Sequence, residues 1–166
     1  MAEQIAGWFV NNLGGIFSPE IIVFIVSLLP ILELRGGIIA GFLMGMDLAP
    51  SFAIAFIGNI IPVPFILIFI KFIFRQLKKT GMKSFIEKLE NKAMSKSDQI
   101  QKYAYWGLML FVGIPLPGTG AWTGALIAAL LNMDIKKSFG VIILGVIMAG
   151  IIISVFSYGL LGMIIN

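Results

Sequence analysis

The chain has 166 residues, of which 59% are hydrophobic and 12% are charged. A soluble domain has roughly 45–50% apolar and about 25% charged residues, so we expect the excess to be buried in a bilayer. The absence of cysteine and histidine excludes disulfides, thiolate metal sites, zinc hydrolases and Ser-His-Asp triads. The composition therefore predicts an integral membrane protein. We expect no metal or cofactor, and we expect no enzyme, because the chain offers no pair of nucleophile and base.

The N-terminal residues 1–17 carry a helical stripe of apolar side chains that includes Trp8. We expect a helix that lies in the external membrane interface and is anchored by this tryptophan. No basic residue precedes an apolar run here, so we expect no removable signal peptide.

Two pairs of apolar stretches are too short to span a membrane. Residues 21–32 stop at the breaker Glu33-Leu34-Arg35-Gly36-Gly37 before residues 38–46 continue, and residues 103–114 stop at 115–120 before 121–133 continue. Twelve helical residues cover about 18 Å, against a hydrocarbon core of roughly 30 Å. Each pair therefore predicts a re-entrant hairpin that turns at depth.

The charges beside each hairpin predict the side from which it enters. Lys102 and Lys136-Lys137 flank the second hairpin, whereas no basic residue flanks the first. By the positive-inside rule, the second hairpin enters from the cytoplasm and the first from outside.

Residues 52–74 and 139–165 are long enough to span a membrane completely. Asn59, Pro62 and Pro64 interrupt the first span, and the prolines predict a kink. Asn59 either lines a cavity at this kink or has no ligand role.

Between the two hairpins, residues 71–102 hold nine basic and three acidic residues, for a local net charge of +6. We expect a multi-pass protein of the plasma membrane whose segment 75–102 lies in the cytoplasm. Its apolar residues recur at helical spacing, which suits either a helix on an anionic membrane surface or a solvated linker helix. We do not expect it to bind nucleic acid, because it lies between membrane segments without aromatic interleaving.

Sliding the sequence on itself by 87 positions aligns the two halves without a gap. The matches are Phe24/Phe111, Pro30/Pro117, Gly37/Gly124, Met46-Asp47/Met133-Asp134, Ser51-Phe52/Ser138-Phe139 and Gly58/Gly145. We predict an all-α membrane domain of two inverted repeats, residues 20–74 and 103–166, each a re-entrant hairpin followed by a full transmembrane helix. In secondary transporters of this architecture the substrate site lies at the repeat interface. Asp47 and Asp134 are expected to cap the spans.

Glu33 and Arg35 are the ionisable residues of the first breaker. Charges at such depth usually face a cavity or pair with another charge. We expect burial to raise the pKa of Glu33 so that it exchanges a proton, while Arg35 holds an anionic head group and Gly36 and Gly37 permit close approach. The alternative is that the two side chains neutralise each other.

The second breaker, residues 115–124, is rich in proline, glycine and threonine. Pro115 and Pro117 end the first arm, and Gly118 and Gly120 leave backbone amides to face a ligand. The sequence adds further candidate ligand-binding side chains in Thr119, Trp122 and Thr123. The alternative is ordinary turn chemistry with small residues packing against neighbouring helices.

With these two motifs, the chain resembles the small multi-drug export protein family, which looks distantly similar to the DedA (VTT-domain) superfamily. The resemblance covers about residues 18–166 and implies facing re-entrant hairpins. In the wider superfamily it implies lipid scrambling or proton-motive-force-dependent return of a polyprenyl-phosphate carrier. Glu33 and Arg35 would match the acidic and basic residues of the first hairpin. DedA proteins typically carry arginines in the second hairpin, whereas this chain has no basic residue between Lys102 and Lys136.

We therefore expect a small transporter or flippase for an amphiphile, with membrane lipids as partners, coupled to protons through Glu33, and assembled as a homodimer or larger homo-oligomer. The first choice of substrate is an anionic lipid carrier such as a polyprenyl phosphate or phospholipid, and the alternative is a hydrophobic cation. A third possibility is a non-transporting scaffold that recruits a cytoplasmic partner through the basic segment.

Overall fold

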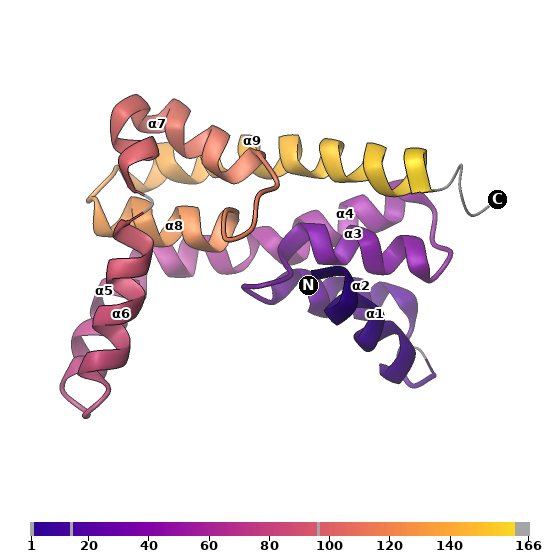
Figure 1. Cartoon of the computed structure of the whole chain (residues 1–166), viewed down its shortest axis with the longest axis horizontal. Coiled ribbons are helices and arrows are strands. Elements are labelled where there is room, and N and C mark those ends of the chain that lie inside the picture. Colours follow the sequence, from indigo (N-terminus) through magenta and orange to yellow (C-terminus); the bar gives the residue numbers. More distant parts are fainter. Residues whose placement is uncertain (1, 14, 96, 162–166) are drawn as a thin grey trace.

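The computed structural model describes residues 2–13, 15–95 and 97–161, and all of the regular structure in these ranges is helical. Figure 1 shows the arrangement. The helices are α1 (Ala2–Leu13), α2 (Pro19–Leu28), α3 (Glu33–Leu43), α4 (Leu48–Ile60), α5 (Pro62–Lys78), α6 (Lys83–Met94), α7 (Ser97–Gly113), α8 (Ala121–Leu130), α9 (Ile135–Ser154) and a π-helical stretch, η1 (Val155–Leu161).

In the described ranges, two helical stretches are long and apolar enough to cross a membrane, as the sequence predicts. One joins α4 and α5 over Leu48–Lys78, and the other extends from Ile135 to Gly159. A single turn residue, Ile61, separates α4 from α5 directly before Pro62. Proline lacks a backbone N–H, so this interruption has the cause predicted from the sequence. The predicted end of the second span, at residue 165, lies outside the described residues.

The short helices are confirmed, but the first break lies elsewhere than predicted. The segment Glu33 to Gly37 does not end a helix: it forms the first turn and a half of α3, where Glu33 has a positive φ of 52°. The helix stops earlier, at Leu29, whose extended backbone precedes Pro30. A residue before proline is pushed out of the helical region, which is why the chain turns here and not at the glycines.

The second break lies where it was predicted, over residues 114–120. The arm before it is longer than expected, however. Helix α7 begins at Ser97, so Lys102 lies within this helix and not at its start. Its 17 residues cover about 26 Å, whereas α2, α3 and α8 each cover only about 15–17 Å.

The helix boundaries follow the 87-residue offset. Helices α3 and α8 end at Leu43 and Leu130, and α4 and α9 begin at Leu48 and Ile135. The α3–α4 and α8–α9 connections lie at opposite ends of the long axis (Figure 1). The inverted orientation of the halves and the re-entrant path through a membrane stay predictions.

One glycine in each spanning stretch allows a close helix crossing. A Cβ atom added to Gly58 of α4 would lie 2.8 Å from the carbonyl oxygen of Phe24 in α2, and one added to Gly145 of α9 would lie 2.8 Å from that of Met109 in α7. Small residues let helix backbones approach in this way. The aligned glycines therefore allow α2 to pack closely on α4 and α7 to pack closely on α9.

Helices α5 and α6 form a hairpin whose tip extends away from the other helices (Figure 1), while both helices also pack against α8. It turns at Gly81, whose φ is 81°, and an ion pair joins Lys78 to Glu90 at 2.6 Å. Ile86 is buried in this hairpin. The predicted helix of the basic segment is thus present and packs on α5, while its cytoplasmic location stays a prediction.

The two aspartates before the spans differ. Asp134 caps α9, because its Oδ1 accepts a hydrogen bond from the Lys137 amide at 2.8 Å. Asp47 takes the same position before α4 without a side-chain cap hydrogen bond. At the N-terminus, α1 packs against α3 and leaves Trp8 exposed, and its external interfacial location stays a prediction.

Candidate substrate site

Glu33 occupies an unusual backbone position at the start of α3. Its φ is 52°, in the left-handed region that non-glycine residues rarely adopt. Its side chain is only 4% exposed. Residues with such strained backbone conformations cluster at active sites and ligand-binding sites.

The Glu33 carboxylate binds the start of α8. Its Oε2 accepts a hydrogen bond from the Ala121 amide at 3.0 Å, and its Oε1 accepts one from the Trp122 amide at 3.2 Å. The first amides of a helix have no partner within the helix and carry partial positive charge. Glu33 therefore supplies the cap that α8 lacks, since the N-cap residue is Gly120.

Gly120 leaves room for this carboxylate. Its φ is 134°, and a Cβ atom at this position would overlap the carboxylate of Glu33. Both the backbone conformation and the space require glycine here.

Arg35 binds the loop that precedes α8. Its Nη1 donates to the carbonyl oxygen of Leu116 at 2.7 Å, and its Nη2 donates to that of Thr119. The described ion pairs do not include one between Glu33 and Arg35. Both side chains bind backbone groups of the other half. We call these four hydrogen bonds the Glu33/Arg35 contact.

The loop at residues 114–120 is shaped by Thr119. Its hydroxyl accepts from the Leu116 amide at 3.2 Å and lies within donating distance of the carbonyl oxygens of Ile114 and Leu116. Pro115 and Pro117 lie in this loop, and Gly118 turns it with a φ of 77°. These residues present the two carbonyl groups to Arg35, so their placement supports a positioning role.

The glycines of the first motif serve helix packing. A Cβ atom on Gly37 would overlap the Ser27 hydroxyl of α2, and one on Gly36 would lie 2.7 Å from Leu32 Cβ. Thr123 is half-buried in the first turn of α8. The structure thus places Gly36 and Gly37 inside the packing of the first half, while Glu33 and Arg35 reach the second.

Two predicted site residues keep unpaired polar atoms. Asn59 is 2% exposed, and its Oδ1, like Trp122 Nε1, is buried without a hydrogen-bond partner among the described residues. An unpaired buried polar atom costs roughly 1–3 kcal/mol. Trp122 adjoins the Glu33/Arg35 contact through its amide, whereas in the described part of the chain no hydrogen bond links Asn59 to it.

The sequence reasoning did not identify Leu116 and Ala121 as partners. Both act through backbone atoms, so their side chains gave no signal. The sequence did offer one indication, because Gly120 precedes the start of a predicted helix. The first backbone amides of a helix can bind an acidic side chain from another segment.

The fold and the Glu33/Arg35 contact define an all-helical membrane protein with two long apolar helices and two pairs of shorter helices, α2–α3 and α7–α8, that meet at this contact. A comparison with known protein families agrees with this class of protein. The chain belongs to the family described as "Putative small multi-drug export protein", whose model matches residues 33–152, more than half of the chain. No curated protein and no solved structure matches it.

Proposed function

We propose that this protein exports amphiphilic molecules across a membrane and that Glu33 couples this transport to protons. The observation that carries the proposal is the Glu33/Arg35 contact, in which a buried acid of one half caps a helix of the other. The family description supports export as the general function.

The proposed cycle depends on making and breaking this contact. A hydrogen bond to an ionised carboxylate is roughly twice as strong as a neutral one, so protonation of Glu33 weakens its hold on the Ala121 and Trp122 amides. The start of α8 and the Glu33 side chain then separate and become accessible to a substrate. Deprotonation then leaves a carboxylate that pairs with a bound cation, if one is present, and otherwise restores the contact.

A hydrophobic cation is the substrate that we favour. The α8 amides and two Arg35 donors are already bound within the chain, so an anionic head group has to displace Glu33. A cation instead takes Glu33 as its counter-ion, and the half-buried ring of Trp122 offers it an aromatic face. This choice also agrees with the printed family description.

An anionic lipid carrier, such as a polyprenyl phosphate or phospholipid, is the second candidate. One observation favours it: a guanidinium has five N–H donors, and the carbonyl groups of Leu116 and Thr119 occupy two of those of Arg35. The distant DedA resemblance agrees with this candidate. In either case we propose assembly into a homodimer or larger oligomer, because two spans enclose a cavity poorly.

The test is transport in proteoliposomes with and without a pH gradient, using ethidium and a fluorescent polyprenyl phosphate in separate experiments. We expect gradient-dependent ethidium efflux that Glu33→Gln abolishes and Arg35→Lys retains, with Glu87→Gln of α6 as the control. Loss of lipid movement in Arg35→Lys, without ethidium transport by the unmodified protein, would favour the lipid carrier.

Movement of neither probe would contradict transport. If neutralising Lys83, Lys88 and Lys92 then impaired the cell more than Glu33→Gln did, a scaffold that recruits a cytoplasmic partner would be the better explanation.

A further inference from the structure

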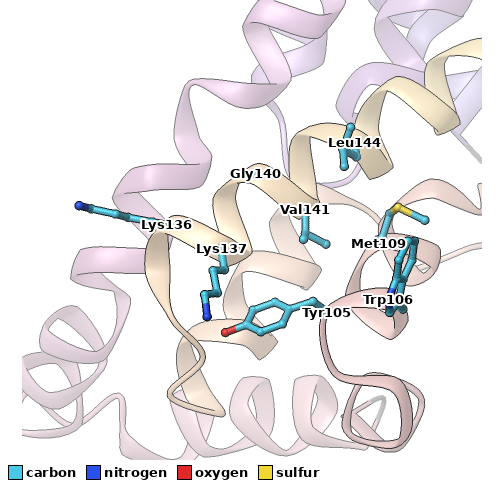
Figure 2. A pocket seen from close by; sticks show the side chains of 8 residues that line it. All are labelled: Tyr105, Trp106, Met109, Lys136, Lys137, Gly140, Val141 and Leu144. Atoms are coloured by element: carbon cyan, nitrogen blue, oxygen red, sulfur yellow. The ribbon is translucent and has the colours of Figure 1, made fainter.

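A groove between α7 and α9 lies outside the Glu33/Arg35 contact. It has a volume of about 420 Å³, within the range of small-molecule sites. Figure 2 shows the side chains that line it. They include Tyr105 and Trp106 of α7 and Lys137, Gly140, Val141 and Leu144 of α9.

One end of the groove is basic. The Lys137 ammonium points toward Tyr105 and lies 6.0 Å from the centre of its ring, whereas Lys136 points away (Figure 2). The neighbouring acid, Asp134, is engaged at the α9 cap, and no described ion pair involves Lys137. Lys137 therefore offers positive charge beside the Tyr105 hydroxyl, which accepts a hydrogen bond from the Asp134 amide at 3.3 Å.

The remainder of the groove is apolar and open. Leu144 follows Lys137 by seven residues, so the apolar wall extends along α9 for about 10 Å. Gly140 forms an open part of this wall, because a Cβ atom there would meet no heavy atom within 4 Å. On the α7 side, Trp106 is 71% exposed.

The basic end lies at the same end of the molecule as other cations. Lys71 of α5 donates a hydrogen bond to Asn132, in the connection that leads into α9. Tyrosine, tryptophan and lysine gather where a membrane meets water. The side chains at the Lys137 end of the groove thus suit contact with lipid head groups, and those at the Leu144 end suit contact with acyl chains.

We propose that this groove binds a phospholipid with an anionic head group. Lys137 and the Tyr105 hydroxyl contact the phosphate, and the upper part of one acyl chain lies along Gly140, Val141 and Leu144. Basic pockets between membrane helices are known to hold anionic lipid head groups. The inference does not depend on the proposed transport function.

The test uses the full chain in detergent, with lipid binding followed by native mass spectrometry and by the shift in unfolding temperature. The probes are phosphatidylglycerol, phosphatidylcholine of the same acyl chains, and inorganic phosphate. We expect phosphatidylglycerol to bind at least fivefold more tightly than phosphatidylcholine, and inorganic phosphate to produce no shift.

Two variants address the two ends of the groove. We expect Lys137→Gln to remove most of the preference for phosphatidylglycerol, and Gly140→Leu to weaken both lipids by filling the apolar wall. Lys88→Gln on α6 changes the net charge equally and is expected to leave binding unchanged. Equal binding of the two lipids, a shift with phosphate alone, or variants that match the Lys88→Gln control would overturn the proposal.

Discussion

Replacing Glu33 by glutamine tests the Glu33/Arg35 contact directly. Glutamine has nearly the same shape, but it has one acceptor oxygen where the carboxylate uses two, toward Ala121 and Trp122. The side-chain NH₂ group of glutamine would therefore face one of these backbone N–H groups, and two donors cannot form a hydrogen bond. A hydrogen bond to a charged group contributes about 1.5–3 kcal/mol, so we expect the free energy of unfolding to fall by about that amount.

The assay is thermal unfolding of the purified protein in detergent. For a chain of this size each kcal/mol changes the unfolding temperature by about 2–4 °C, so Glu33→Gln is expected to lower it by about 3–12 °C. Glu87→Gln is the matched control, because its partner Lys83 lies 3.9 Å away on the surface of α6. Such a pair contributes only about 0.3–0.5 kcal/mol. Equal unfolding temperatures for the two variants would refute the assignment of the carboxylate as the cap of α8.

Three further predictions concern glycines and one tyrosine. Gly120→Ala forces a side chain into the Glu33 carboxylate, so we expect it to lower the free energy of unfolding at least as much as Glu33→Gln does. In a double-mutant cycle, we expect the variant with both substitutions to be little less stable than Gly120→Ala alone. Gly145→Ala is expected to lower the free energy of unfolding by about 1–3 kcal/mol, because the added methyl group overpacks against α7. Gly140→Ala meets open space and should leave the unfolding temperature unchanged or higher. Equal losses in the two variants would contradict the close packing of α7 on α9 at Gly145. Tyr158→Phe removes a hydroxyl that lies 3.0 Å from the Met46 carbonyl oxygen and 2.8 Å from Ser51 Oγ, and we expect a loss of about 1 kcal/mol in denaturant unfolding.

The two long helices were predictable because length and composition alone determine whether a helix can cross a bilayer. The position of the first break was not. Both Pro30 and the Gly36-Gly37 pair are plausible breakers in a sequence, and only the packing shows that Gly37 meets Ser27 inside a helix. A glycine that marks a bend and one that marks a helix crossing have the same sequence signal.

The sequence indicated Glu33 and Arg35 as candidates, but it did not indicate the hydrogen bonds that these side chains form. Glu33 and Arg35 stand out because buried charges are costly. Their partners are backbone groups of Leu116, Thr119 and Ala121, which no pattern of side chains identifies. The same limit applies to Asp47 and Asp134, since matching positions in the repeat do not lead to matching cap hydrogen bonds.

The Glu33/Arg35 contact also has a consequence for biosynthesis. Its partners are separated by 81 to 89 residues, so a ribosome makes the acid and the base long before it makes the backbone groups that satisfy them. Until the second half follows, the hydrogen bonds of Glu33 to the α8 amides and of Arg35 to the 114–120 loop cannot form. The first half therefore cannot complete the surroundings of α3 before the second half has been made.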